Sequence, residues 1–172
     1  METMKALLER RSVRGYKPDP IPADVLEDIL KAGTYAATGM GAQSPIILAV
    51  TNRAVRDKLS ALNAKVVGRE GDLFYGAPVV LVVLADKSVP THVYDGSLVM
   101  GNLMLAAFDR GVASCWIHRA KETFETEEGK ALLRELGIEG EYEGIGNCVL
   151  GYPADGWPEA KPRKEHYVYY VK

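Results

Sequence analysis

Hydrophobic residues recur along this chain at two spacings, one typical of helices and the other of strands. Between Pro22 and Tyr35 they lie three and four positions apart, which predicts a helix with one apolar face. Residues 77–85 are apolar without interruption, which is typical of a strand buried on both faces. Similar patterns predict helices over 4–10, 53–67, 94–110 and 126–136, and strands over 46–51, 112–118, 144–151 and 167–171. Because helices and strands alternate, we expect an α+β fold, an α/β sandwich whose mixed central sheet is flanked by helices.

The predicted helix over residues 94–110 is apolar on almost every side, so each side needs a cover. A domain of 172 residues rarely encloses a whole helix, which favours an interface with a second subunit. The alternative is a central helix of the core. Segment 68–76 is polar instead, and we expect a mobile loop there.

Length and composition indicate one globular domain that spans residues 1–172. The net charge is −2, from 21 basic and 23 acidic residues, so the chain lacks the basic excess of proteins that bind nucleic acid through general charge. Residues 1–14 and 159–172 each carry a net charge of +2, which leaves −6 for the middle of the chain. Either this excess arises by chance, or both ends meet around one anion.

The two cysteines, Cys115 and Cys148, form neither a disulfide framework nor a metal-binding spacing. The apolar run at 77–85 is far shorter than the roughly 20 residues of a membrane span, and the first residues lack the apolar core of a signal peptide. We therefore expect a soluble protein of the reducing cytoplasm. The sequence contains no dinucleotide-binding glycine motif, P-loop, serine-hydrolase elbow or zinc-protease motif.

Basic residues cluster in two short motifs, Arg10-Arg11-Ser12-Val13-Arg14 and Lys161-Pro162-Arg163-Lys164. Arginine offers a planar fork of donors and serine a short hydroxyl, and together they suit a phosphate monoester. In an extended Lys-x-Arg segment, both side chains point to the same side. Each cluster taken alone is also compatible with a solvated run of charge.

The first motif, continued by Gly15-Tyr16, resembles the N-terminal signature of the FMN-dependent nitroreductase family. Further segments that resemble parts of that family follow in the family's order, at residues 36–45, 74–78, 95–107, 111–117, 151–153 and 161–163. Each match is weak by itself, but their order is specific and they cover nearly the whole chain.

This resemblance implies a homodimer with two FMN sites at its interface, each lined by both subunits, and a C-terminal tail strand exchanged between them. It implies NADH or NADPH as electron donor. It implies no catalytic side chain, because N5 of the flavin carries the chemistry.

The resemblance also assigns roles to individual residues. The residues that it assigns to the FMN phosphate are Arg10, Ser12, Lys161 and Arg163. Arg11 would lie alongside the cofactor, with its backbone close to the ring. Arg14 faces the pyrimidine edge of the ring, where a cation stabilises the negative charge of reduced flavin. Gln43 bonds the ring or the ribityl chain, and Ile117 and His118 offer backbone N–H groups near N5. Asn63 is either a further contact at the pyrimidine edge or a solvated polar residue of its helix.

Two features depart from the family pattern. Gly41 stands where many members have an asparagine, so a contact of that side chain is missing. The chain is also short for the family, which predicts a more open site.

Three residues near the expected flavin ring have more than one interpretation. Cys115 is either a small buried strand residue or a nucleophile. Trp116 packs near the flavin or in the core, and His118 is a candidate proton donor to substrate.

The expected activity is NAD(P)H-dependent reduction of a nitroaromatic, a quinone or a related flat acceptor, by ping-pong hydride transfer through flavin N5. Three alternatives remain open. One is a flavin-binding or storage protein without turnover. Another is a specialised flavin enzyme that acts on an unsaturated or halogenated metabolite. The third is an interaction domain that has lost the flavin.

Overall fold

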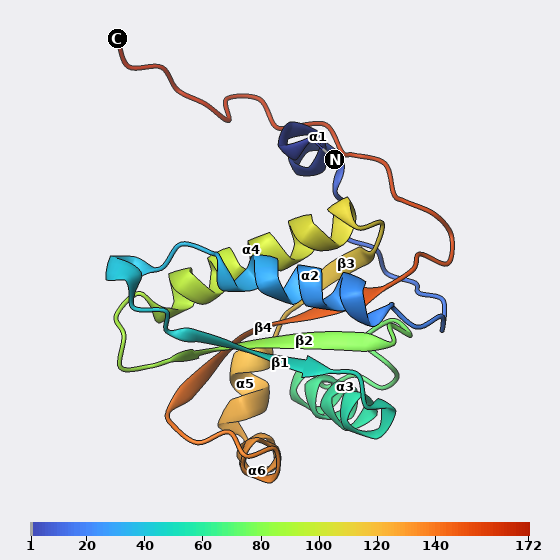
Figure 1. Ribbon diagram of the computed structural model, residues 1–172, viewed down its shortest axis with the longest axis vertical. Coiled ribbons are helices and arrows are strands. Elements are labelled where there is room, and N and C mark those ends of the chain that lie inside the picture. Colours follow the sequence, from blue (N-terminus) through green and yellow to red (C-terminus); the bar gives the residue numbers. More distant parts are fainter. Residues whose placement is uncertain (1) are drawn as a thin grey trace.

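The structure, a computed structural model, describes residues 2–172 and has one sheet with helices on both faces (Figure 1). The strands are β1 (Pro45–Val50), β2 (Val79–Asp86), β3 (Ala113–Ile117) and β4 (Tyr142–Gly151). They lie in the order β1-β2-β4-β3, and each neighbouring pair is antiparallel. The expected α+β fold is confirmed. The sheet, however, is antiparallel in its four strands, and an isolated bridge between Ser12 and Ser114 supplies a parallel contact.

The helices form a layer on each face of the sheet. On one face lie α2 (Ala23–Thr34) and α4 (His92–Asp109), and on the other lie α3 (Arg53–Val67), α5 (Ala120–Glu125) and α6 (Glu127–Glu135) (Figure 1). A short 3₁₀ helix, η1 (Gly39–Gly41), precedes β1. Helix α1 (Thr3–Glu9) lies at the end of the molecule from which the C-terminal tail extends (Figure 1).

Strand β2 explains the uninterrupted apolar run, because its side chains alternate between two cores. Val80, Val82 and Leu84 belong to the core under α3, α5 and α6. Leu81 and Val83 belong to the core under α2 and α4. All five are fully buried, so neither face of the strand tolerates a polar residue.

Local signals set the ends of the helices. The side chain of Asn52 accepts a hydrogen bond from the N–H of Val55 at 3.1 Å and caps the start of α3. That helix ends at Gly68, whose φ of +67° is the left-handed conformation that favours glycine. The start of α5 packs against β4 at Gly144, where a Cβ would lie 2.4 Å from the carbonyl oxygen of Ala120.

The strand expected over residues 167–171 is not formed in the single chain. Residues 154–172 are exposed, and no strand within the described range pairs with them. A strand needs a neighbour for its backbone hydrogen bonds, and the tail has none among the described residues of this chain.

Two further expectations differ from the structure. Segment 68–76 is fastened to the domain, since the carboxylate of Asp72 accepts hydrogen bonds from the N–H groups of Phe74 and Gly76, and Phe74 is fully buried. The alternative of a central core helix is wrong for α4, because Tyr94 and Leu98 are 73% and 50% exposed in the single chain. The subunit interface expected for this helix stays a prediction.

None of the helices in residues 2–172 combines the length and the apolar character that crossing a membrane requires.

Candidate functional site

The N-terminal basic motif runs as an extended segment across the start of β3 and the end of β4. Ser12 forms the parallel bridge with Ser114, and Tyr16 forms an antiparallel bridge with Pro153. The N–H of Val13 donates to the carbonyl oxygen of Ser114 at 3.1 Å. The segment is therefore attached to the sheet at two points.

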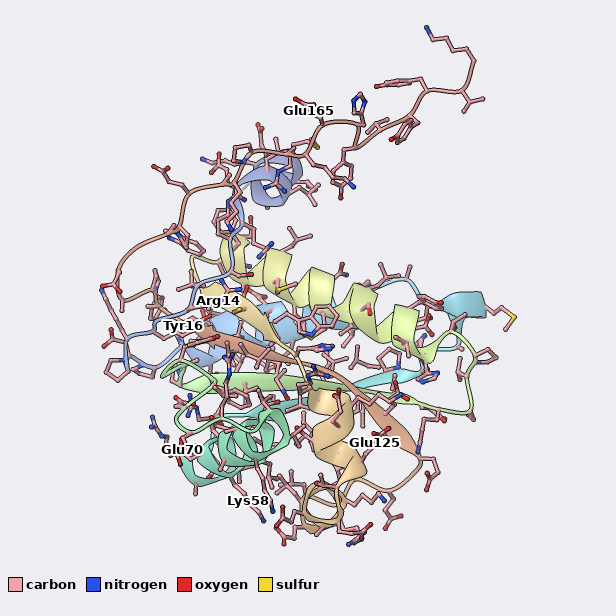
Figure 2. All side chains as sticks on the ribbon, turned by 180° about the vertical axis from the view of Figure 1, so that it is seen from behind. Arg14, Tyr16, Lys58, Glu70, Glu125 and Glu165 are labelled. Carbon is pink, nitrogen blue, oxygen red and sulfur yellow. The ribbon has the colours of Figure 1, made fainter. Side chains whose placement is uncertain are left out.

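Tyr16 holds this segment in place through two hydrogen bonds. Its ring is buried, its hydroxyl donates to the carbonyl oxygen of Val13 at 2.8 Å, and its N–H donates to the carbonyl oxygen of Tyr75 at 3.2 Å. Burial raises the pKa of the phenol, so it stays neutral. Arg14, two residues earlier, is exposed, and Figure 2 shows it beside Tyr16 at one side of the sheet.

Three buried polar atoms beside β3 have no hydrogen-bond partner within the described chain: Nη1 of Arg10, Oγ of Ser114 and Nε1 of Trp116. Leaving a buried donor unpaired costs about 1–3 kcal/mol, and more for a charged group. Such atoms indicate that an acceptor from outside the chain belongs here. The guanidinium of Arg10, with Ser12 next to it, suits an anionic oxygen.

The far end of β3 carries the two residues expected near flavin N5. Ile117 ends the strand and is half-buried, and His118 follows it and is exposed. Trp116 and His118 line a cavity of about 260 Å³ together with Ser97 and Glu143. Because β3 is an edge strand, its outer side beyond the Ser114 bridge is not covered by another strand.

The thiols close to this edge are not activated. Burial raises the pKa of Cys115 and raises that of Cys148 to about 12. Both thiols are therefore protonated at neutral pH, and a protonated thiol is a poor nucleophile. Cys115 is 2% exposed, which favours the interpretation of a small buried strand residue.

Gln43 lies at the opposite end of the sheet. Figure 2 shows Arg14 on one side and η1, the cyan element just before Gln43, on the other. The backbone N–H of Gln43 donates to Oγ1 of Thr38 at 3.1 Å. Gln43 also lines a groove of about 420 Å³ between α2 and β1, whose walls include Leu30, Ile47 and Val99. The strand register agrees with this placement, because Pro45, two residues after Gln43, pairs with Ala85 at one end of β2, whereas Ser114, beside the Arg14 segment, pairs with Leu150 at the other end of β4.

A buried carboxylate fixes the loop that carries Gln43. Asp95 is 2% exposed and accepts hydrogen bonds from the N–H of Gly39 and the hydroxyls of Ser44 and Thr91, at 2.9, 2.9 and 3.0 Å. Burial raises the pKa of Asp95, but these hydrogen bonds outweigh burial and lower it overall. Asp95 is not among the site residues expected from the sequence, although an acidic residue in the first turn of an apolar helix is a visible signal.

The C-terminal basic motif lies on the exposed tail. The guanidinium of Arg163 donates to the carbonyl oxygen of Lys161 at 2.6 Å, and both residues are exposed. Figure 1 shows the tail leaving the molecule at the end that carries α1, which leads directly into Arg10. Arg11, next to Arg10, is half-buried and donates to the Arg10 carbonyl oxygen at 2.6 Å. The two basic motifs therefore share one end of the molecule.

Asn63 lies elsewhere. It is 1% exposed, on the face of the sheet covered by α3 and α5, with its Oδ1 3.5 Å from the hydroxyl of Thr123. The alternative of a solvated helix residue is therefore wrong. The structure brings Arg10, Arg11, Ser12 and Arg14 together beside β3, with Ile117 and His118 at its end. It does not bring Asn63 or Gln43 to them.

Comparison with known proteins assigns the architecture. The model of the nitroreductase family matches residues 7–71 and 64–152. A nitroreductase with bound FMN from Bacteroides fragilis is 31% identical, with a TM-score of 0.89 and complete coverage of both chains. A protein of Archaeoglobus fulgidus with the provisional name NADH dehydrogenase/NAD(P)H nitroreductase is 30% identical, over 90% of this chain and 87% of its own length. A protein of the same provisional name from Methanothermobacter thermautotrophicus is 26% identical, over 90% and 79%. From its sequence and its fold, this chain belongs to the nitroreductase family.

Proposed function

We propose that the chain is an FMN-dependent oxidoreductase that takes electrons from NADH or NADPH. Its acceptor is a nitroaromatic, a quinone or a related flat molecule, reduced in a ping-pong sequence. Family membership, the names of the relatives and the FMN in the similar B. fragilis structure support this proposal. The free, buried thiols of Cys115 and Cys148 suit the reducing cytoplasm, where we place the protein.

The observation that carries the proposal is the buried, unpartnered Nη1 of Arg10. A charged donor without an acceptor is costly, and a phosphate oxygen offers the strongest complementary acceptor. Ser12 lies two residues further, on the bridge to Ser114, and adds a hydroxyl. Lys161 and Arg163, from the tail at the same end, would close this phosphate clamp.

The remaining ring contacts follow from the direction of β3. With the phosphate at Arg10, the ring would extend along the open edge of the strand toward Ile117 and His118. FMN, when bound, supplies hydride chemistry at N5. Arg14 would stabilise negative charge at the pyrimidine edge, and the backbone of Ile117 and His118 would orient the ring.

The site is incomplete without a second copy of the chain. Gln43 lies at the far end of the sheet from Arg14, so Gln43 would reach the flavin of the other subunit (Figure 2). The exposed side of α4, with Tyr94 and Leu98, would be covered in this homodimer. The homodimer thus accounts for both observations.

The tail strand would be completed in the same dimer. Residues 167–171 are rich in tyrosine and valine, which favour strands. The sheet has two edges, and β3 is already bridged to Ser12 at one of them. We therefore assign the exchanged tail to the free edge of β1, beside the apolar groove that Gln43 lines.

A visible spectrum of the purified protein tests the proposal. We expect the flavin absorption of a stoichiometric bound FMN, bleached without oxygen by NADH or NADPH and restored by a quinone or nitroaromatic. Protein that binds FMN but shows no steady-state oxidation of either nicotinamide would be a flavin carrier. Protein that takes up no FMN would overturn the proposal altogether.

A further inference from the structure

The C-terminal tail has a defined last point of attachment. After β4, the N–H of Ala154 donates to the carbonyl oxygen of Gly15 at 3.0 Å. Three residues later, the ring of Trp157 packs on Phe108 with a centroid distance of 4.9 Å and an interplanar angle of 89°. Beyond Trp157, no hydrogen bond or ion pair in residues 158–172 reaches the rest of the domain.

The partner of Trp157, Phe108, lies close to the start of β3. Phe108 is 9% exposed and lies in the last turn of α4, which leads through a short turn into β3. The start of β3 carries Ser114, the bridge partner of Ser12. Trp157 is therefore attached to the same end of the molecule as the Arg10 cluster, and edge-to-face packing is the preferred geometry for such a ring pair.

We propose that Trp157 is a positioning residue that holds the start of the Lys161–Arg163 segment beside the phosphate clamp. This inference rests on the proposed FMN site. Lys161 and Arg163 follow Trp157 by four and six residues, so the attached ring leaves a short tether. Without it, the last attachment is Ala154, nine residues before Arg163. A longer tether lowers the effective concentration of the two cations at the phosphate.

The consequence is selective for ligands that carry a phosphate. Riboflavin has the same ring as FMN but no phosphate, so it gains nothing from Lys161 or Arg163. Mutating a residue that positions these cations should weaken the binding of FMN and leave the binding of riboflavin unchanged. Mutating a residue that only supports the fold should weaken the binding of both flavins.

The test measures dissociation constants of FMN and riboflavin for the flavin-free protein, by quenching of flavin fluorescence. We expect Trp157→Ala to weaken FMN binding about twofold, because the tether to Arg163 lengthens from six to nine residues and the entropic cost of closing it rises with the logarithm of its length. The riboflavin dissociation constant should not change, because riboflavin has no phosphate for Lys161 or Arg163 to contact. Trp157→Phe, which keeps an aromatic ring against Phe108, should restore most of the FMN affinity. Leu136→Ala removes an apolar side chain of similar exposure, 40% for Leu136 and 41% for Trp157, and should change the dissociation constant of neither flavin.

Arg163→Ala separates this inference from the proposed function. If Arg163→Ala weakens FMN selectively while Trp157→Ala does not, the clamp stands and the role of Trp157 is overturned. Equal weakening of FMN and riboflavin in Trp157→Ala would assign Trp157 to the fold and also overturn it. If Arg163→Ala leaves the FMN-to-riboflavin ratio unchanged, the phosphate clamp itself fails, and the inference fails with it.

Discussion

Arg10 and Arg14 lie four residues apart in one extended segment but differ in burial. Nη1 of Arg10 is buried without a partner, whereas Arg14 is exposed. A buried donor needs a directed acceptor, so Arg10 suits an anion whose charge is permanent, such as a phosphate. An exposed cation acts through its charge, and this action is strongest where charge appears during a reaction.

We expect Arg14→Gln to lower the two-electron reduction potential of the bound flavin while oxidised FMN stays bound. Reduction places negative charge at the pyrimidine edge, and the variant lacks the cation that stabilises it. Because Arg14 is exposed, solvent and salt screen it, and the expected decrease is about 10–30 mV, from 30 mV per 1.4 kcal/mol.

Spectroelectrochemistry of parent and variant measures this decrease. Arg69→Gln, an exposed arginine just after α3, removes the same charge on the other face and serves as control. An unchanged potential in Arg14→Gln would remove Arg14 from the mechanism. Equal decreases in both variants would indicate an effect of net charge only.

At the scale of elements, an ion pair between the buried Arg56 and the partly exposed Asp72 connects α3 to the segment that precedes β2. Arg56 is 1% exposed and donates to Asp72 at 2.6 Å and to the carbonyl oxygen of Ala77 at 2.9 Å. Asp72 in turn holds the N–H groups of Phe74 and Gly76, as described above. Because Tyr75 between them accepts from the N–H of Tyr16, this pair also supports the N-terminal segment.

The same pair predicts how stability depends on pH. Burial raises the pKa of Asp72, but hydrogen bonds from Arg56, Ser60 and two backbone N–H groups outweigh it and lower the pKa to about 2. A depressed carboxyl pKa adds stability above the unfolded value near 3.8, and this stability is lost as pH falls toward 2.

Asp72→Asn should therefore lower the free energy of unfolding at pH 7 by roughly 1 kcal/mol, because Asp72 is partly exposed to screening solvent and Arg56 keeps Asp57 as a second acceptor. The deficit should shrink as pH falls from 5 to 2. Urea unfolding at several pH values measures both effects. A deficit that is constant across this range would show that the charge of Asp72 does not contribute.

At the scale of the whole molecule, exposed apolar side chains lie on α1, on one side of α4 and along the C-terminal tail. Met4, Leu7 and Leu8 are 62%, 52% and 65% exposed, and Tyr94 and Leu98 are 73% and 50% exposed. Large exposed apolar patches of this kind mark interfaces between proteins. A symmetric pair of copies would bury the patch of each on the other.

We expect light scattering at micromolar concentration to give twice 18.8 kDa for the parent protein. Leu98→Lys places a charge on the exposed side of α4 and should weaken the dimer tenfold or more. Val67→Lys makes the same change at a 37% exposed site on α3, on the other face, and should leave the mass unchanged. A monomeric parent that still binds FMN would contradict this assembly.

The sequence by itself determined the elements whose patterns are local or continuous. β2 was predicted from its apolar run, because a strand buried on both faces has apolar residues at every position. α2 and α3 were predicted from helical spacing, because a helix buried on one face has apolar residues three and four positions apart. The order of the basic and small-residue motifs was sufficient to indicate the family, which the comparisons confirm. The basic motif that begins at Arg10, for which we propose phosphate binding, was likewise visible, since its residues are neighbours in sequence.

Only the tertiary structure decided what depends on long-range contacts. Asn63 is polar and lies in a helix, so no sequence rule predicted its burial against Thr123. Gln43 and Arg14 lie in motifs of one family, yet they lie at opposite ends of the sheet, as the pairing of Pro45 with Ala85 and the bridge of Ser12 to Ser114 show. The tail at 167–171 has the composition of a strand but no neighbour within one chain, because backbone pairing is a property of two segments and not of one.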